Sequence, residues 1–361
     1  MGPQSISNIS ANSERAKVLK QSILILWDEI TLMNHEHLRC VNDLIIDICK
    51  NRFPFGNKVV VLGGDSRQCL PVIKRASKTE VLENLITRGN IFHHFERIHL
   101  TASMRASSDP QFARWLLQVG RGSHDDIIRL PQSIVTDAPI IDATFGSRST
   151  DFVSHLIENK CILAPSNDLT LKLNEEVLDK VPGEVKEFLS ADVSLSDDGS
   201  EINYLGSVVI LLRNLAPDDG YCNGTRMIVR ELGRNLIRCS PLSKPHKTFI
   251  VPTIKLSTNN TESPINFMRT QFPLRLSNAM TINKSQGKTF DKIGIVLSQP
   301  VFTHGQLFVA LSRVRRFEDV KILISHRIDQ GFESVDNYQT QLLSNNTTTR
   351  ITITVKCIRE P

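Results

Sequence analysis

Two short polar runs, each at the end of an apolar stretch, contain the side chains that phosphoryl transfer requires. Asp28 and Glu29 follow "SILILW", and Asp65 and Gln68 follow "NKVVVLGG". In nucleotide hydrolases one carboxylate helps to hold Mg²⁺, a second accepts a proton from the attacking water, and a glutamine orients that water. Two neighbouring acids can equally begin a helix. The two runs together favour a nucleotide hydrolase, because open α/β sheets bind ligands at the carboxyl ends of their strands.

Two arginines could complete such a site. Arg105 ends "LTASMR" and Arg313 lies in "ALSRVRR". A guanidinium group can meet the charge that develops on a transferring phosphoryl group, and such a contact is worth on the order of 10³ to 10⁵ in rate. Either arginine alone could instead form a surface or interdomain salt bridge. As an ordered pair they strengthen the prediction of a nucleotide cleft.

The sequence "INKSQGKTF" contains Gly287-Lys288-Thr289, which resembles the end of a phosphate-binding loop. The full pattern G-x-x-x-x-G-K-[ST] needs an earlier glycine where Ile282 stands, and a helix must follow it. Here "FDKIGIVLSQP" follows, and its β-branched apolar residues and final proline predict a strand. We therefore reject a phosphate loop at this position. The pattern occurs nowhere else in the 361 residues.

The elements that must position these residues follow an alternating order. A short helix capped by Ser13 is predicted first. A buried strand, a helix and a second buried strand follow, over residues 22–27, 35–52 and 57–64, and "FERIHLTASMR" reads as a third strand-like element. A helix is expected over 109–122 and a linker from about 130 to 155. A second unit begins with "KCILAPSNDLTLKLNEEVL". Residues 205–240 predict a small antiparallel module, and α/β elements return near 271.

Composition sets loose limits on function. The chain has 361 residues, 40% of them hydrophobic, and a net charge of +5, so a polyanionic partner is permitted but not required. Its seven cysteines form no C-x-x-C pair and suggest buried thiols in a reducing compartment. No apolar run is long enough to span a membrane, and residues 1–17 lack the apolar centre of a signal peptide. Cytosol or nucleus is therefore expected.

Seven segments resemble, in order, successive motifs of Pif1-like DNA helicases, especially the type found in Helitron transposons. They are "LILWDEITLMNHEHL", "VVVLGGDSRQCLPV", "LTASMR", "CILAPSNDLTLKLNEEVL", "LLRNLAPDDGYCNGTRMIV", "LRLSNAMTINKSQGKTFDKIGI" and "GQLFVALSRVRR". The resemblance runs from about residue 5 to 325. It implies an α/β fold of two RecA-like parallel-sheet domains, the first incomplete, with a small antiparallel β module inserted in the second. The implied limits are 1–130 and, for the second domain, 159–183 with 271–328. Residues 131–158 would be a linker, 184–270 the module, and 329–361 a tail of uncertain structure.

The resemblance also assigns roles and partners. Asp28 and Glu29 would hold Mg²⁺ and activate water, Gln68 would sense the γ-phosphate of ATP, and Arg105 and Arg313 would reach it from two sides. Asp65, Gln286 and Gly287 would line the nucleotide cleft. Contacts to single-stranded DNA are implied for Pro165, Ser166, Asn167, Thr281, Asn283, Lys284 and Ser285. The implied activity is ATP-dependent unwinding of DNA with 5′ to 3′ movement, at duplex junctions, in repair, recombination or transposon replication. Nuclear residence is expected, with mitochondrial residence as the alternative.

The absent phosphate loop is the main departure from this family. Without it the backbone cradle, the phosphate-binding lysine and a hydroxyl ligand for Mg²⁺ are missing, and the first domain lacks a central strand, which would leave an apolar sheet edge open. We therefore expect the 361 residues alone neither to hydrolyse ATP nor to unwind DNA, as a truncated product of a helicase or a decayed transposon copy. The alternative is a non-enzymatic remnant that binds single-stranded DNA or another partner. A nucleotide-binding protein unrelated to DNA is a third possibility.

Overall fold

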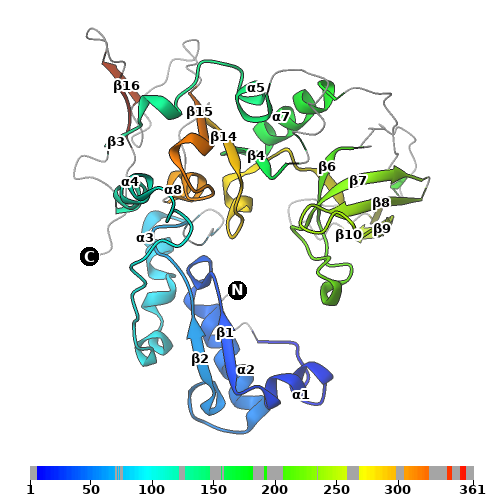
Figure 1. The fold of residues 1–361 in the computed structure, drawn as a ribbon. Coiled ribbons are helices and arrows are strands. Elements are labelled where there is room, and N and C mark those ends of the chain that lie inside the picture. The colour runs from blue at the N-terminus through cyan, green and yellow to red at the C-terminus, as the bar shows by residue number, and fades with distance from the viewer. Residues whose placement is uncertain are drawn as a thin grey trace.

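Figure 1 shows the computed structural model of the protein, in which a small parallel lobe is followed by a larger parallel sheet with helices, and an antiparallel sheet is inserted in the chain between two strands of that larger sheet. The structure describes residues 6–69, 71, 73, 76–121, 127–146, 156, 158–181, 191–192, 206–233, 235–257, 268–297, 305–324, 340–343 and 350–354. The predicted α/β class, with parallel sheets and an antiparallel sheet, is confirmed.

The first lobe is built on two parallel strands, β1 (Leu24–Trp27) and β2 (Val59–Leu62), joined by α2 (His35–Cys49). Side chains on one face pack with α2 around Leu38 and Ile45. Successive side chains of a strand point to opposite faces. On the other face four apolar side chains, those of Leu24, Leu26, Val59 and Val61, are between 45% and 71% exposed. The strands expected to be buried are thus covered on one face only.

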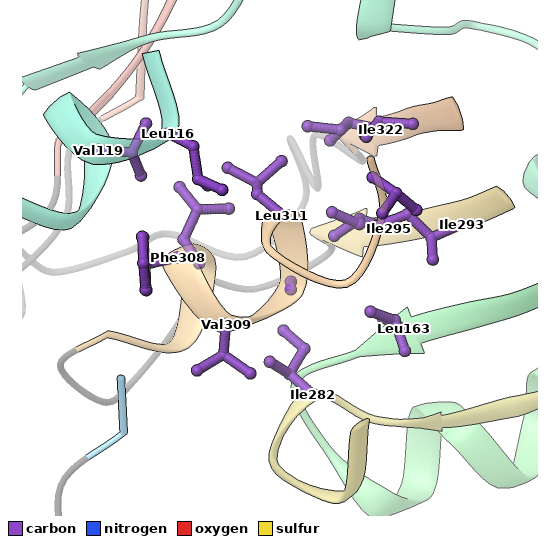
Figure 2. Close-up of a cluster of buried hydrophobic side chains, with 14 of the residues drawn as sticks. Leu116, Val119, Leu163, Ile282, Ile293, Ile295, Phe308, Val309, Leu311 and Ile322 are labelled. Atoms are coloured by element: carbon purple, nitrogen blue, oxygen red, sulfur yellow. The ribbon is translucent and has the colours of Figure 1, made fainter. Parts of the chain in front are cut away.

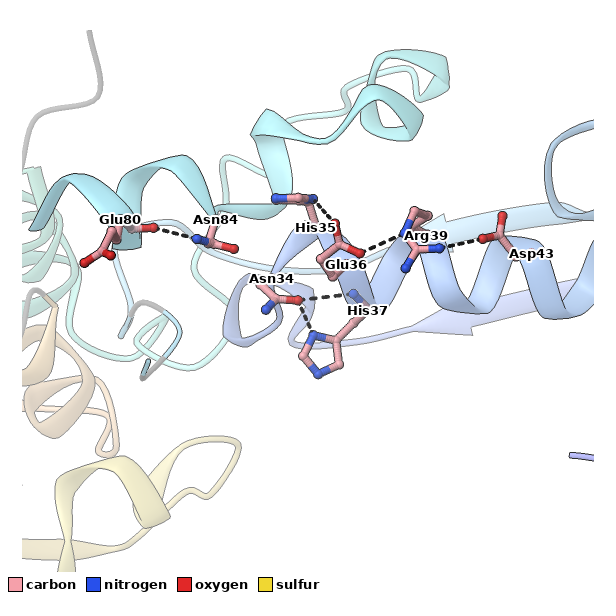
Figure 3. A network of polar contacts seen from close by, with 8 residues as sticks. All are labelled: Asn34, His35, Glu36, His37, Arg39, Asp43, Glu80 and Asn84. Carbon is pink, nitrogen blue, oxygen red and sulfur yellow. Dashed lines mark hydrogen bonds and ion pairs between the residues drawn. The ribbon is translucent and has the colours of Figure 1, made fainter. Parts of the chain in front are cut away.

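Polar contacts fix the beginning of α2 (Figure 3). The side chain of Asn34 accepts a hydrogen bond from the backbone of His37 at 3.2 Å, which is the usual way to satisfy a free N–H group in a first helical turn. The backbone N–H of His35 donates to the carbonyl of Asn84, which follows α3 (Lys78–Glu83). The short helix α1 (Glu14–Gln21) begins after Ser13, as predicted. These contacts join α2 to the residues after α3.

Residues 95–105, expected to form a third strand, contain no strand in the structure. Ile98 and Leu100 are 80% and 93% exposed. In the described part of the chain β1 and β2 pair only with each other. The prediction is wrong because a strand needs a hydrogen-bonding neighbour, and this segment has none among the described strands.

The second lobe contains a four-stranded parallel sheet in the order β13–β4–β14–β15. The strands are β13 (Ala279–Thr281), β4 (Lys160–Ala164), β14 (Lys292–Leu297) and β15 (Val320–Ile324). Leu163 and Ile295 face a core formed with α4 (Pro110–Arg121) and α8 (Gln306–Leu311), as Figure 2 shows. Ile162 faces the opposite core, formed with α5 (Ile140–Phe145) and α7 (Asn167–Asp179). Helices therefore cover both faces, as parallel sheets require.

Two helices lie where the sequence suggested other roles. The predicted helix α4 falls within the range expected for the first domain, but its Phe112, Leu116 and Val119 belong to the core of the second sheet. Residues expected to be a linker contain α5, whose Ile140 and Phe145 are buried against that sheet. The linker expectation is wrong for α5, because its short apolar run is too brief to show helical periodicity but is long enough to cover strands.

Five antiparallel strands form the module between α7 and β13, in the order β12–β6–β7–β8–β9. Their bounds are Val208–Leu211 for β6, Arg226–Leu232 for β7, Leu236–Pro241 for β8, Phe249–Pro252 for β9 and Leu274–Leu276 for β12. A second antiparallel sheet contains β10 (Ile254–Ser257), β11 (Met268–Gln271) and β5 (Ala191–Asp192). In the tail, β16 (Thr340–Leu343) and β17 (Arg350–Thr354) pair with each other, and β17 pairs with β3 (Ile127–Arg129).

Among the described residues, no helix combines the length and the apolar character that a membrane crossing would need.

Candidate functional site

The two acidic runs lie at the same edge of the first sheet. Asp28 follows β1 and Asp65 follows β2, and these strands are parallel neighbours. A Cβ atom on Gly63 would lie 2.7 Å from Oδ1 of Asp28, so a larger residue would displace this carboxylate. The Asp28 carboxylate also accepts a hydrogen bond from the backbone N–H of Glu29 at 2.9 Å. The structure thus brings together the acids that the sequence singled out.

Glu29 lies in a strained and partly buried position. Its backbone is left-handed, with φ 52° and ψ 38°, a conformation that is uncommon for a residue with a side chain. Burial raises the pKa of its carboxyl, the neighbouring Asp28 raises it further, and Arg313 and Arg105 lower it. A carboxyl group with a raised pKa is a better proton acceptor than an ordinary one. Because both arginines lower the pKa of Glu29, both lie close enough to interact with its carboxylate electrostatically.

Gln68 lies where the two lobes meet. Its Oε1 accepts a hydrogen bond from Nε2 of Gln286 at 2.9 Å, across 218 positions of sequence. A Cβ atom on Gly305, just before α8, would lie only 2.4 Å from the carbonyl oxygen of Gln68, and Gly305 has φ 73°. Only glycine allows the chain to pass so close in this conformation. The loop that carries Gln68 is therefore packed against the first turn of α8.

Arg105 reaches the second lobe directly. Its Nε donates to the hydroxyl of Thr289 at 3.1 Å, and its Nη1 donates to the carbonyl of Ser312 at 2.9 Å. Burial and the nearby Arg315 lower the pKa of its guanidinium, whereas Glu29 raises it. A guanidinium with an ordinary pKa above 12 keeps its charge in spite of this.

Arg313 is only 2% exposed, and within the described part of the chain its guanidinium donates to backbone carbonyls and to a hydroxyl. Its Nε donates to the carbonyl of Val309, its Nη1 to the carbonyls of Ser285 and Lys288, and its Nη2 to the hydroxyl of Ser312. Burial, together with the charge of Arg105, lowers the pKa of its guanidinium to about 10. It is charged at neutral pH. A buried positive charge that is solvated mainly by carbonyl dipoles can attract an anion strongly.

The residues expected to contact DNA lie at one edge of the second sheet. Thr281 pairs with Ala164 across the parallel strands β13 and β4, so the segments 165–167 and 281–285 follow neighbouring strand ends. Lys284 is exposed, and burial of its stem and the nearby Arg275 lower the pKa of its amine. The hydroxyl of Ser285 is buried and donates to the carbonyl of Ile282 at 2.6 Å.

Each remaining residue of this set has a definite environment. Ser166 caps α7 by accepting from the backbone of Leu169, while Pro165 is buried and Asn167 is exposed. Asn283 accepts from Nε2 of Gln306 at 3.3 Å. Lys284 and Asn167 are therefore the residues of the set whose side chains face solvent, whereas Ser285 acts within η7 (Ile282–Ser285).

Comparisons with known proteins find similarity to Pif1-like DNA helicases. A family model described as PIF1-like helicase matches residues 1–128, and one described as DNA helicase Pif1, 2B domain, matches residues 204–232. ATP-dependent DNA helicase PIF1 of Homo sapiens is 33% identical over 314 residues, which cover 83% of this chain and 46% of that protein. The chain thus spans less than half the length of this relative.

Solved structures give the same result. A structure of two coordinating Pif1 helicases at forked double-stranded DNA is similar with a TM-score of 0.65 and 26% identity, covering 89% of this chain and 74% of the other. The Pif1 helicase of Bacteroides in complex with ADP-AlF3 and single-stranded DNA has the same fold, with a TM-score of 0.65, 23% identity and coverage of 91% and 76%. The comparisons support the Pif1-like helicase family.

Four contacts in the candidate site were not foreseen from the sequence. Arg67 forms a two-pronged ion pair with Asp65, at 2.7 and 2.9 Å, and its guanidinium lies 5.4 Å from the ring centre of Phe308. Thr289 and Ser312 hold Arg105. The spacing Asp65-x-Arg67 could have suggested the ion pair. Nothing local to Thr289 indicates a partner 184 positions away.

The candidate site contains few side chains that could coordinate a metal ion directly. Among the described residues, no group of three or more His, Cys, Asp or Glu side chains is arranged to hold a metal ion. Asp28 is exposed, and one or two carboxylates together with phosphate oxygens are sufficient for Mg²⁺. The carboxylates present therefore fit a magnesium ion that arrives with a nucleotide.

Proposed function

We propose that the chain forms much of the motor of an ATP-dependent DNA helicase, with the nucleotide bound between the two lobes. The observation that carries this proposal is the convergence of Gln68 and Arg105 with Gln286 and Arg313 of the second lobe. Residues 1–130 and, for the second domain, 159–183 with 271–328 would form two RecA-like domains, with residues 184–270 as the insertion, except that α4 joins the core of the second domain. ATP between two such domains can drive opening and closure, because it makes different contacts in the two states.

The roles follow from the environments of the side chains. Glu29, whose pKa is raised, would accept a proton from the attacking water, and Gln68 would orient that water. Arg105 and Arg313 would stabilise the charge that develops on the phosphoryl group. Asp28 would hold Mg²⁺, which supplies positive charge at the phosphate oxygens. Asp65, Gln286 and Gly287 would line the cleft.

The antiparallel module would lie next to DNA. Residues 206–257 contain eight Lys and Arg but three Asp and Glu, whereas the whole insertion, residues 184–270, contains ten of each. The basic residues of 206–257 are therefore the part of the insertion that we expect to meet a phosphate backbone, with little sequence preference and strong dependence on salt. Single-stranded DNA would cross this module and the edge that carries Lys284. We further propose 5′ to 3′ movement, in nuclear or mitochondrial DNA repair, recombination or the replication of a Helitron-type transposon.

The 361 residues contain no phosphate-binding loop. We therefore propose that they do not hydrolyse ATP unaided and need a loop supplied by a further segment. The exposed apolar face of β1 and β2 supports this, because parallel sheets are normally covered on both faces.

An ATPase assay with and without single-stranded DNA tests the proposal. It compares the 361-residue chain with a version extended by the strand, phosphate loop and helix of a Pif1-like relative, and uses Glu29→Gln of the extended version as a control. We expect DNA-stimulated hydrolysis by the extended protein, and none by the chain alone or the control. Binding of DNA without hydrolysis by the extended protein would favour a binding remnant. Hydrolysis without stimulation by DNA would favour a nucleotide-binding protein of another kind.

A further inference from the structure

The run Gly287-Lys288-Thr289, which is not a phosphate loop, contacts two distant parts of the molecule at once. The Nζ of Lys288 donates to the carbonyl of Gly224 at 2.8 Å, in the turn that joins β6 to β7 of the antiparallel module. The hydroxyl of the next residue, Thr289, accepts from Nε of Arg105 at 3.1 Å. Two adjacent side chains therefore join the module to an arginine of the candidate nucleotide site.

The end of this link in the module is well fixed. Gly224 has φ 93°, and its N–H donates to the carbonyl of Leu211 at 2.8 Å, while Thr225 donates to Cys222 at 3.0 Å. The turn therefore moves together with β6 and β7. Burial, together with the nearby charge of Arg226, lowers the pKa of the Lys288 amine. The amine is held inside a contact rather than in free solvent.

A second connection runs beside the first. Nδ2 of Asn159 donates to the carbonyl of Thr289 at 2.8 Å, and Oδ1 of Asn159 accepts from Nη1 of Arg226 at 3.4 Å. Arg226 begins β7, and its guanidinium also donates to the carbonyls of Lys160 and Ser277 at 3.0 and 3.1 Å. The backbone at Thr289 is thus tied to the same strand of the module that follows the Gly224 turn.

The other end of the link reaches both arginines of the site. Arg105 donates to the carbonyl of Ser312 at 2.9 Å in addition to Thr289, and Arg313 donates to the carbonyl of Lys288 at 3.2 Å. A displacement of residues 288–289 must therefore alter a hydrogen bond of each guanidinium. Hydrogen-bond lengths and angles tolerate only small changes before the interaction weakens.

We propose that Lys288 and Thr289 are positioning residues that transmit the placement of the antiparallel module to Arg105. The functional meaning of this link rests on the proposed function, in which Arg105 meets the phosphate and the module lies beside DNA. The contact chain itself does not depend on that function. Coupling through such a chain is demonstrated only when a change at one end alters the other.

Hydrogen exchange of the 361-residue chain, followed by mass spectrometry, tests the link without nucleotide or DNA. In Lys288→Met the bond to Gly224 is lost, and we expect amide exchange to rise at least about threefold both at residues 222–226 and at residues 103–107. Lys292→Met is the matched control, since it removes another half-buried lysine four residues away, in β14. It should leave both segments as in the parent protein.

Substitutions at Thr289 test the second half of the link. Thr289→Val should raise exchange at 103–107, and Thr289→Ser, which keeps the hydroxyl, should restore it. In the double variant Lys288→Met/Thr289→Val, exchange at 103–107 should be no faster than in Thr289→Val alone, because both changes cut the same chain. The proposal is overturned if Lys288→Met speeds amide exchange at residues 222–226 but leaves exchange at residues 103–107 unchanged. It is also overturned if the rise in exchange at 103–107 in the double variant equals the product of the rises in the two single variants. These results stand whether or not the ATPase test succeeds, so the two proposals can fail separately.

Discussion

Arg313→Met should lower the free energy of local unfolding of η7 and α8 by about 2–4 kcal/mol, because the guanidinium donates hydrogen bonds to several buried groups at once. The carbonyl of Lys288 loses the donor that it accepts at 3.2 Å, and a buried carbonyl left without a partner costs about 1–3 kcal/mol. The carbonyls of Ser285 and Val309 keep other partners, the N–H of Lys288 and the hydroxyl of Ser312. Their loss is smaller, about 0.5–1.5 kcal/mol each. The substitution also removes the cost of keeping a positive charge out of water, which offsets part of this loss of stability.

Local hydrogen exchange is the appropriate assay, because unfolding of a chain with several sheets need not be two-state. A loss of 2–4 kcal/mol corresponds to a rise of about 30- to 1,000-fold in the exchange rate of amides that open with this lobe. The amides to follow are those of α8 and of η7. Arg313→Lys should lie between the parent and Arg313→Met, since lysine keeps the charge but not the planar fork of donors.

Arg316→Met is the matched control for this experiment. Arg316 is half-exposed and forms ion pairs with Asp319 at 3.1 and 3.2 Å, and such surface pairs contribute little to stability. Its loss should leave exchange of the α8 amides near that of the parent. If Arg313→Met behaved like Arg316→Met, the buried guanidinium would not organise this end of the lobe, and the reasoning would be refuted.

Three further predictions concern single groups. In a ¹³C NMR titration Glu29 should titrate above its ordinary pKa of 4.5, because burial and Asp28 favour its protonated form, and Asp28→Asn should move the midpoint down. Glu29 must be ionised to accept a proton, so ATP hydrolysis by the extended protein should fall as the pH falls through that raised pKa. A titration midpoint of Glu29 below 4.5 would contradict this. Burial raises the pKa of the Cys239 thiol to about 12, so Cys239 should resist thiol labelling at pH 8 in the folded chain, whereas the half-buried Cys222 should react. Equal labelling rates for the two cysteines would contradict the burial of Cys239. Lys284→Ala should weaken binding of single-stranded DNA and reduce the salt slope by about 0.7 if this lysine meets one phosphate, and an unchanged slope would remove it from the DNA path.

Local patterns were enough to predict most elements of the second lobe. The apolar runs of β4 and β14 are bounded by polar residues, and the prediction of a strand after Gly287 was confirmed. Ser13 acts as the predicted helix cap through a hydrogen bond within three residues, which is why the local sequence reveals it. The acids after β1 and β2 could be placed at one edge because parallel neighbours end on the same side.

Local patterns gave wrong predictions where the structure of a segment depends on the element beside it. Ile98 and Leu100 alternate with polar residues as in a strand, yet residues 97–101 form none, because a strand is completed by hydrogen bonds to another strand. The apolar side chains of β1 and β2 predicted burial on both faces, but one face is exposed. Sequence alone specifies that a surface is apolar; what covers it depends on the rest of the fold.

The sequence by itself thus determined the residue types available for phosphate chemistry, the approximate order of the elements and the absence of a phosphate loop at Gly287. Only the tertiary structure decided that Arg105 bonds to Thr289 and Ser312, that Gln68 meets Gln286, and that Lys288 holds the Gly224 turn. Three of these pairs are separated by more than 180 residues. Such contacts leave no local trace, because they depend on how independently formed lobes pack against each other rather than on the spacing of residues along the chain.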